Sequence, residues 1–539
     1  MTRVLCLGLD GADHDLVRDL VAQGRLPTIA RLARQGTFGA LRSTIPAVTP
    51  TAWSTFLTGL NPGGHGIFNF TTNANRATQR VENAASRGGT PFWRALGDAG
   101  VRSAFVGIPF TYPPEPIAGV LVTGYGGPPR PTVLPASAAE RIFAAYPDLV
   151  TAHHPMAERW WEDFPRYARR LVEHVEQTAG VCRIALELEP DLQLLCADFM
   201  SSDVAGHLGY SRLDPDHPAH DPANAGDELI QVYESVDRAC GELIEEAARH
   251  FGEEPTVLLL SDHGMKPIHW VFHANQWLEE AGLLRFRRRS LQPLRRSRLH
   301  FAAQVDQRLA RTRPVYSRVL DAIPLLPRPA RDRAFSDIDF GRTRAYCYGT
   351  GGQVFFGEAS GALGDPGVER EVEQALGEVR NPATGEQAFD VKRKEELYHG
   401  PFLHKAPDLV LLPRDERLFV ESSRRSWPGP FERHERLDPE AFYGYSGHHG
   451  VEGILVAAGP GIRPGELSPG AEITQMAATV LALFGISAEL DGAPLEIAER
   501  EGTAERAFAA APAAGREDPV YSQEEEAAMV ERLRDLGYE

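Results

Sequence analysis

Val4-Leu5-Cys6-Leu7-Gly8-Leu9-Asp10-Gly11 is the stretch of this sequence that decides the fold class. Residues 4–9 contain no polar interruption, and a strand with this pattern is buried on both faces. Such strands belong to parallel sheets that are covered by helices on both sides. Asp10-Gly11 closes the run, so a carboxylate follows the carboxyl end of a buried strand.

Similar apolar runs recur along the chain and alternate with helical patterns. The further strand candidates are residues 103–108, 192–197, 256–260, 406–412 and 453–458. The helix candidates include a segment that begins near Pro27 and stops at Gly36, and residues 91–99, 167–188 and 231–250. The sequence therefore predicts an α/β fold with a mainly parallel central sheet flanked by helices.

The composition is that of an acidic globular protein. The chain has 539 residues, of which 42% are hydrophobic and 24% charged, and its formal net charge is −18. This charge argues against a general nucleic-acid-binding coat. Five scattered cysteines fit a reducing compartment better than a disulfide framework. No apolar run approaches the ~18 residues of a membrane span, and the N-terminus lacks a signal-peptide pattern, so we expect a soluble cytoplasmic protein.

The length predicts either one large domain with insertions or two domains. We expect residues 1–265 and 401–500 to form the core, 266–400 an inserted cap region and 501–539 a peripheral tail with a short helix at 522–536. Residues 285–333 carry fourteen arginines and three aspartates. They are read either as a solvated excursion or as a cap that attracts an anionic substrate, anionic lipid or nucleic acid. The sequence leaves the oligomeric state open.

Four places along the chain offer metal-ligating side chains beside predicted strands. In open α/β folds, ligands bind outside the carboxyl ends of strands, so these places are expected to converge. Mixed carboxylate and imidazole ligation suits Zn²⁺, or else Mn²⁺, better than Ca²⁺ or Mg²⁺. Each residue alone has an ordinary reading as a cap or a turn, and the prediction of two divalent metal ions depends on their co-occurrence. The candidate ligands are Asp10, Asp203, His207, Asp262, His263 and His449.

A second element surrounds Thr49. Thr49 is suited to the N-cap of a helix, Pro50 to its first position and Gly59 to its end. A hydroxyl at a helix N-terminus lies where backbone N–H groups favour an anion, and beside a metal it becomes a nucleophile. The alternative is that Thr49 only caps the helix.

Taken in order, these motifs resemble the alkaline phosphatase superfamily. The resemblance covers nearly the whole chain outside the arginine-rich segment, and it is nearest to the type I phosphodiesterase/nucleotide pyrophosphatase family, particularly its bacterial predicted phosphohydrolase or phosphomutase branch. It implies an alkaline-phosphatase-like fold. The motifs are Asp10-Gly, Thr49 before Thr58-Gly59, Pro62-x-x-His65-Gly-Ile67, Asp203-x-x-x-His207, Ser261-Asp262-His263-Gly264-Met265 and Gly447-x-His449-Gly450.

The resemblance also implies how the site is divided. One metal would be held by Asp203, His207 and His449. The other would be held by the remaining ligands, which are Asp10, Asp262, His263 and the nucleophile Thr49. Two metals about 4 Å apart would clamp the attacking and leaving oxygens of a displacement at phosphorus.

One position departs from the family pattern. Nucleotide pyrophosphatases place an asparagine shortly after the His-Gly-Ile run, where it binds a phosphate oxygen. This chain has Phe70 there, with Asn69 one residue earlier. Asn69 is the candidate substrate-binding residue, and the departure puts nucleotide specificity in doubt.

The remaining choices concern the substrate. Thr49-Pro50-Thr51 lacks the cysteine or serine that sulfatases convert to formylglycine, so that class is excluded. No arginine lies between Thr49 and Gly59 to neutralise a dianionic monoester. We therefore expect a two-metal phosphohydrolase that cleaves a phosphodiester or pyrophosphate bond of a small substrate through a phosphothreonine. The alternatives are a phosphomutase, a phosphomonoesterase or, from another class, a non-catalytic binding protein of the same fold.

Overall fold

The structure is a computed structural model that describes residues 2–72, 80–153, 160, 163–287, 337–357, 366–422, 429–437, 444–497, 506–509, 521 and 529. It separates into two compact units. Unit 1 comprises residues 1–269, 392–407 and 434–538, and unit 2 comprises residues 270–391 and 408–433. The arginine-rich residues from 288 to 333 and the predicted helix at 522–536, apart from Met529, lie outside the described residues. The limits predicted from the sequence at 265, 400 and 500 remain a prediction.

A nine-stranded sheet forms the centre of unit 1, in the order β20-β2-β19-β9-β1-β8-β5-β6-β7. The strands β9, β1, β8, β5 and β6 are parallel, whereas β19 runs antiparallel to β9 and β2, and β7 antiparallel to β6. This arrangement confirms the predicted α/β class with a mainly parallel sheet. The bounds are β20 Gly465–Glu466, β2 Thr37–Arg42, β19 Glu452–Ala458, β9 Thr256–Leu260, β1 Val4–Gly8, β8 Leu194–Asp198, β5 Ser103–Val106, β6 Gly119–Val122 and β7 Val133–Leu134.

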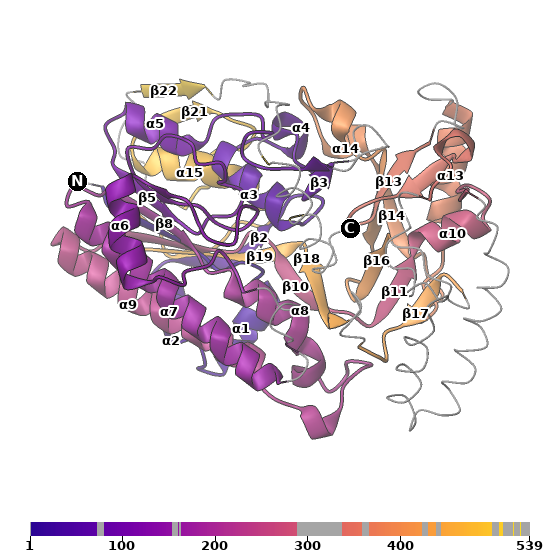
Figure 1. Cartoon of the computed structure of the whole chain (residues 1–539), viewed down its shortest axis with the longest axis horizontal. Coiled ribbons are helices and arrows are strands. Elements are labelled where there is room, and N and C mark those ends of the chain that lie inside the picture. The colour runs from indigo at the N-terminus through magenta and orange to yellow at the C-terminus, as the bar shows by residue number, and fades with distance from the viewer. Residues whose placement is uncertain are drawn as a thin grey trace. The chain divides into compact units, whose positions relative to one another are not determined.

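Helices cover both faces of this sheet (Figure 1). One layer consists of α1 His14–Ala22, α2 Pro27–Gln35, α6 Ala136–Ala145, α7 Phe164–Leu188, α8 Ser201–Leu213 and α9 Glu228–Phe251. The other consists of α3 Thr49–Thr58, α5 Phe92–Asp98 and α15 Met476–Leu483, with the short α4 Pro62–His65 following α3. No helix among the described residues is long and apolar enough to cross a membrane.

The buried strand β1 explains why the two layers form. All five of its residues are buried, and Val4 and Cys6 pack with Trp53, Phe56 and Phe92 from the α3 and α5 layer. The opposite layer contains α9, whose buried residues recur at helical spacing along its length. A strand that is apolar on both faces requires this double cover.

Unit 2 contains two smaller sheets, in the orders β16-β11-β17 and β12-β13-β15-β14. The strand predicted at 406–412 is β15 of this unit. The bounds are β11 Trp270–His273, β12 Ala345–Cys347, β13 Gln353–Phe356, β14 Phe389–Arg393, β15 Leu409–Pro413, β16 Leu418–Glu421 and β17 Phe431–Arg433, with helices α10 Ala274–Glu280 and α13 Pro366–Gly377. The remaining short elements are α14 Lys394–Leu397, β3 Thr71–Thr72, β4 Arg80–Val81, β10 Gly264–Pro267, β18 Gly447–Gly450, β21 Ile486–Glu489, β22 Arg506–Ala509, and 3₁₀ turns at Pro222–Asn224, Phe340–Arg342, Leu403–Lys405 and Ile473–Gln475.

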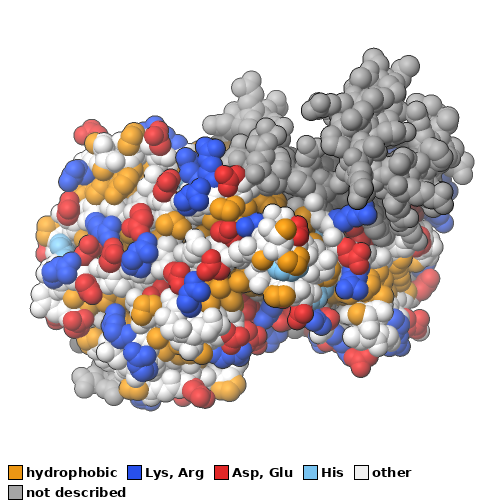
Figure 2. Space-filling view, turned by 90° about the horizontal axis from the view of Figure 1, so that it is seen from below, with side chains coloured by type: hydrophobic (Ala, Val, Ile, Leu, Met, Phe, Trp, Pro, Cys, Tyr) orange, Lys and Arg blue, Asp and Glu red, His pale blue; other side chains and the backbone are white. Residues whose placement is uncertain are grey.

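The visible surface agrees with the acidic, mixed composition. Figure 2 shows one face, on which Lys and Arg side chains are interspersed with Asp and Glu side chains. No broad area of a single sign covers the described atoms of this face. This pattern differs from the basic stripe of a nucleic-acid-binding surface.

Two buried imidazoles are expected to make unit 1 sensitive to acid. Burial lowers the pKa of His65 to about 3 and that of His174 to about 4. In the unfolded chain these imidazoles bind a proton near pH 6.5, whereas in the folded protein they stay neutral until a lower pH. The free energy of unfolding is therefore highest above pH 6.5 and falls as the pH is lowered toward the pKa values of the folded state. Between about pH 7.5 and about pH 5, each histidine should remove about 2 kcal/mol from the free energy of unfolding.

The measurement is urea unfolding at the two pH values. His65→Gln should lose about 2 kcal/mol less than the wild type on acidification. His250→Gln, at the exposed end of α9, is the control and should follow the wild type. An equal loss in His65→Gln and the wild type would show that His65 does not cause the acid sensitivity.

Candidate metal centre

The candidate ligands gather at one edge of the central sheet. Because β1 and β9 are parallel, their carboxyl ends lie together, and Asp10, Asp262 and His263 follow these strands within three residues. Since β19 runs antiparallel to β9, the residues that precede β19 lie at the same edge. This strand direction brings His449 to the edge from which Asp10 and Asp262 project.

The turn after β1 brings α8 close. Gly11 has φ +67, and a Cβ there would lie 3.0 Å from Cα of Asp203. Ser202 Oγ donates a hydrogen bond to the carbonyl of Asp10 over 2.7 Å. Glycine is thus required both by the backbone conformation and by the close approach, and the contact places Asp203 beside Asp10.

A second close approach positions the remaining imidazoles. β18 pairs with β10 so that His449 lies opposite Met265. A Cβ at Gly447 would lie 2.4 Å from the carbonyl oxygen of Gly206 on α8. Because Gly447 has no side chain, β18 packs directly on α8, and His207 meets His449.

Thr49 occupies the first residue of α3 and not the N-cap. The N-cap is Val48, in an extended conformation and without a side-chain cap bond, so the predicted N-cap position of Thr49 was wrong by one residue. Pro50 is tolerated at the second helical position because N–H groups of the first turn have no intrahelical partner. Gly59 ends the helix at φ 67, as predicted. The Thr49 hydroxyl is therefore not used for capping.

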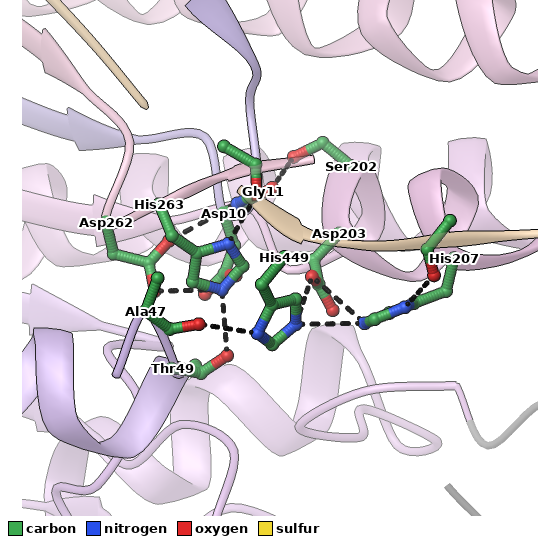
Figure 3. Close-up of polar contacts among 12 residues, drawn as sticks. Asp10, Gly11, Ala47, Thr49, Ser202, Asp203, His207, Asp262, His263 and His449 are labelled. Carbon is green, nitrogen blue, oxygen red and sulfur yellow. Dashed lines mark hydrogen bonds and ion pairs between the residues drawn. The ribbon is translucent and has the colours of Figure 1, made fainter. Parts of the chain in front are cut away.

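Thr49 faces one group of ligands (Figure 3). Its Oγ1 lies 3.2 Å from Nε2 of His263. The same Nε2 lies 3.7 Å from Oδ1 of Asp10 and 3.4 Å from Oδ2 of Asp262. All four side chains are at most 1% exposed, so the hydroxyl is held among ionisable groups away from bulk water.

A second group adjoins the first. Oδ1 of Asp203 lies 3.5 Å from Nε2 of His207 and 3.4 Å from Nε2 of His449. The His449 ring stacks on His263 with centroids 3.8 Å apart. Figure 3 shows His449 between His263 on one side and Asp203 and His207 on the other.

All three imidazoles turn the same nitrogen toward the centre. A carbonyl can only accept, so each Nδ1 must carry the proton and each neutral Nε2 a lone pair. Nε2 of His207 and Nε2 of His449 nevertheless lie 3.0 Å apart. Two lone pairs at this distance repel each other unless a cation or a proton lies between them. The carbonyls that accept from His263, His207 and His449 are those of Gly264, Gly447 and Ala47, respectively.

The lowered pKa values of the imidazoles argue against a proton between the two Nε2 atoms. Burial lowers the pKa of His207 and His449, and it lowers that of His263 to about 4. All three imidazoles are therefore neutral at pH 7, which is the form that binds a metal.

Burial also shifts the pKa values of the carboxylates. Burial, followed by the charge of Asp262, raises the pKa of Asp10 well above its usual value. Burial, followed by the charge of Asp203, raises the pKa of Asp262 to about 7. For Asp203 burial is outweighed by the neighbouring His207 and His449, and its pKa is lowered. The raised pKa values of Asp10 and Asp262 indicate that these two carboxylates are not readily ionised together without added positive charge.

The donor set fits two divalent cations. Two groups have ligand atoms that all lie within 4.8 Å of one another: Asp203 with His263 and His449, and Asp10 with Asp262 and His263. Oδ1 of Asp10, Oδ1 of Asp203 and Oδ2 of Asp262 are buried and lack a hydrogen-bond partner among the described residues. Ligation of a metal ion would give these atoms a partner.

Three residues at the site were missed by the sequence reasoning. Trp53 donates its indole N–H to Oδ2 of Asp10 over 2.8 Å. Tyr445 stacks on the ring of His207 at 4.8 Å. Asp198 ends β8 beside β1, and burial followed by the charge of Asp262 raises its pKa. Only Asp198 had a signal, as a carboxylate at a strand end; the other two contacts arise from packing.

Asn69 is buried at 3% exposure. Its Oδ1 accepts from the backbone N–H of Phe70 over 2.8 Å. Its Nδ2 has no hydrogen-bond partner among the described residues. The amide therefore keeps a donor group that the described residues leave unused.

A known protein family matches most of the chain. The sequence profile described as type I phosphodiesterase / nucleotide pyrophosphatase matches residues 4–450. A comparison with curated proteins found no match. The matched range contains every candidate ligand, and the mixed, mostly parallel sheet fits the alkaline-phosphatase fold. The chain belongs to the type I phosphodiesterase/nucleotide pyrophosphatase family of the alkaline phosphatase superfamily, a family of phosphoric ester hydrolases.

Proposed function

We propose that the protein is a two-metal phosphohydrolase that cleaves a phosphodiester or pyrophosphate bond through a phosphothreonine at Thr49. The observation that carries this proposal is the buried cluster of three Nε2 atoms and three carboxylates, in which Thr49 Oγ1 lies 3.2 Å from Nε2 of His263. We assign Asp203, His207 and His449 to one metal. Asp10, Asp262, His263 and Thr49 are assigned to the other.

The residues of the chain then have distinct roles. The cations, when bound, would lower the pKa of the hydroxyl and neutralise charge on the phosphoryl oxygens. Thr49 Oγ1 forms a bond to phosphorus while the bond to the leaving oxygen breaks, and water later cleaves the phosphothreonine and restores the hydroxyl. Trp53 holds the Asp10 carboxylate through Oδ2, which leaves Oδ1 for ligation.

Zn²⁺ is the proposed metal, with Mn²⁺ as the alternative, because the ligands mix carboxylates with imidazoles. We also propose that Asn69 donates its unused Nδ2–H to a phosphate oxygen. The cytoplasm is the proposed location, which the five free, buried cysteines support.

A diester is expected to be the better substrate. Two divalent cations face three ligand carboxylates, so little positive charge is left for a dianionic monoester, whereas a diester carries a single negative charge at phosphorus. The ratio of kcat/KM for bis-(p-nitrophenyl) phosphate to that for p-nitrophenyl phosphate should therefore exceed one at about pH 7.5.

In the same assay Asn69→Ala should raise KM more than it lowers kcat.

A monoester preference of about tenfold, equal to about 1.4 kcal/mol in transition-state binding, would reject the diesterase assignment. The triple variant Arg287→Ala/Arg288→Ala/Arg289→Ala identifies the source of such a preference. Its disappearance in that variant would assign specificity to the arginine-rich segment. Phosphoryl return to a second hydroxyl of the same product, and not to water, would support a phosphomutase.

A further inference from the structure

The segment that leads into β18 contacts His207 at three points. The ring of Tyr445 stacks on the imidazole at 4.8 Å with an interplanar angle of 25°. The N–H of Ser446 donates to the carbonyl of His207 over 2.7 Å. The Nδ1–H of His207 donates to the carbonyl of Gly447 over 2.9 Å. The orientation of His207 therefore depends on where residues 445–447 lie.

Two further histidines donate hydrogen bonds to the backbone of this segment. His434 donates its Nε2–H to the carbonyl of Tyr445 over 2.8 Å. His217 donates its Nε2–H to the carbonyl of Ser446 over 3.1 Å. These imidazoles are 1% and 2% exposed, respectively. Two consecutive carbonyls thus each accept from a buried imidazole, one 229 residues away in sequence and the other 11.

The tautomer of His217 is defined by the hydrogen bond at its Nδ1. Nδ1 accepts the backbone N–H of Ala219 over 3.0 Å, so the single proton of the neutral ring lies on Nε2. Burial, followed by the neighbouring His434, lowers the pKa of His217 to about 3. His217 is therefore a neutral donor with one fixed tautomer at pH 7.

A displacement of this segment would affect both imidazoles of one proposed metal site. β18 continues from Gly447 to His449, whose Nε2 lies 3.0 Å from Nε2 of His207. The N–H of Ile268 also donates to the carbonyl of Ser446, over 2.8 Å, and this bond keeps β18 in register with β10. The segment thus links the two imidazoles geometrically.

We propose that His217 and His434 are positioning residues that hold residues 445–447 and thereby fix the spacing of His207 and His449. The proposal rests on the metal role of His207 and His449 given above. Neither His217 nor His434 belongs to the candidate metal-binding groups. Groups that orient metal ligands from behind typically change metal affinity by 10–100-fold when they are replaced.

Glutamine and asparagine provide matched substitutions. The Nε2 of glutamine reaches about as far as the Nε2 of histidine, whereas the Nδ2 of asparagine ends near the position of Nδ1 and falls short. We expect His217→Asn/His434→Asn to bind one of its two metals at least about tenfold more weakly in chelator competition. We expect His217→Gln/His434→Gln to stay within about threefold of the wild type.

Hydrogen exchange of the metal-free proteins gives a second readout. Amides of residues 446–450 should exchange at least about tenfold faster in the asparagine variant, while those of β5 keep the wild-type rate. His220→Ala is the control from the same loop, since His220 bonds to the carbonyl of Ser211 and not to residues 445–447. It should leave exchange and affinity unchanged.

Equal behaviour of the asparagine and glutamine variants, in exchange as well as in affinity, would overturn the proposal. A wild type that binds no metal would instead overturn the proposed function. In that case the exchange rates of the metal-free variants still decide whether the two histidines hold the segment.

Discussion

Thr49→Ala is expected to lower kcat by at least about a thousandfold, or about 4 kcal/mol in activation free energy. In the proposed mechanism the Thr49 hydroxyl attacks phosphorus, and it lies 3.2 Å from Nε2 of His263. Because Val48 is the N-cap of α3, loss of the hydroxyl removes no cap bond, and the fold should persist. Steady-state kinetics and thermal unfolding of the same preparation check both points.

Two variants on the same helix separate chemistry from packing. Thr49→Ser keeps a hydroxyl and should retain measurable turnover. Thr51→Ala removes an equally buried hydroxyl, 0% exposed, two residues further along α3, and should stay within about threefold of the wild type. A silent Thr49→Ala together with a damaging Thr51→Ala would make the nucleophile assignment wrong.

Asp262→Asn/His263→Ala is expected to reduce the metal content from about two ions per chain to about one. The substitutions remove two of the protein donors assigned to the metal beside Thr49, and too few remain to hold it. The metal assigned to Asp203, His207 and His449 keeps all three of its assigned ligands. Metal content measured by inductively coupled plasma mass spectrometry on protein purified without added metal gives the stoichiometry.

The stability of the metal-free protein in chelator tests the role of Asp262 independently of metal content. Burial and Asp203 raise the pKa of Asp262 to about 7, so an ionised Asp262 is costly in the metal-free protein. Asp262→Asn should therefore be at least as stable as the wild type when both are stripped of metal.

The control for the metal-content measurement is His14→Ala/Asp15→Asn, which replaces an adjacent His-Asp pair outside the cluster, 3.5 Å apart. This variant should keep both metals, and metal loss in it would invalidate the assignment.

The sequence was sufficient for the fold class. Val4–Gly8 is buried throughout, as a run without polar interruption predicts. The strand ends shortly before Asp10, where the apolar run also ends. The long helices were also predictable: α9 spans Glu228–Phe251 against the predicted 231–250. Both successes depend on local pattern, in which apolar spacing determines burial.

The features that the sequence could not supply arise from tertiary contacts. The antiparallel direction of β19 brings His449 to the carboxyl ends of the parallel strands, and no local pattern specifies strand direction. The bond from Trp53 to Asp10 joins residues 43 apart in sequence. Thr49 was placed at the N-cap because its side chain suits that position, whereas its hydroxyl bonds to His263, which local preference cannot reveal.

The most direct test of the two-metal assignment combines metal content with activity. Protein purified without added metal is analysed for divalent ions, and hydrolysis of bis-(p-nitrophenyl) phosphate is measured before chelation, in excess chelator and after metal is restored. The account predicts about two ions per chain, loss of activity in chelator and recovery as the second equivalent of metal is added. Protein that carries no divalent metal and keeps full activity in excess chelator would contradict it.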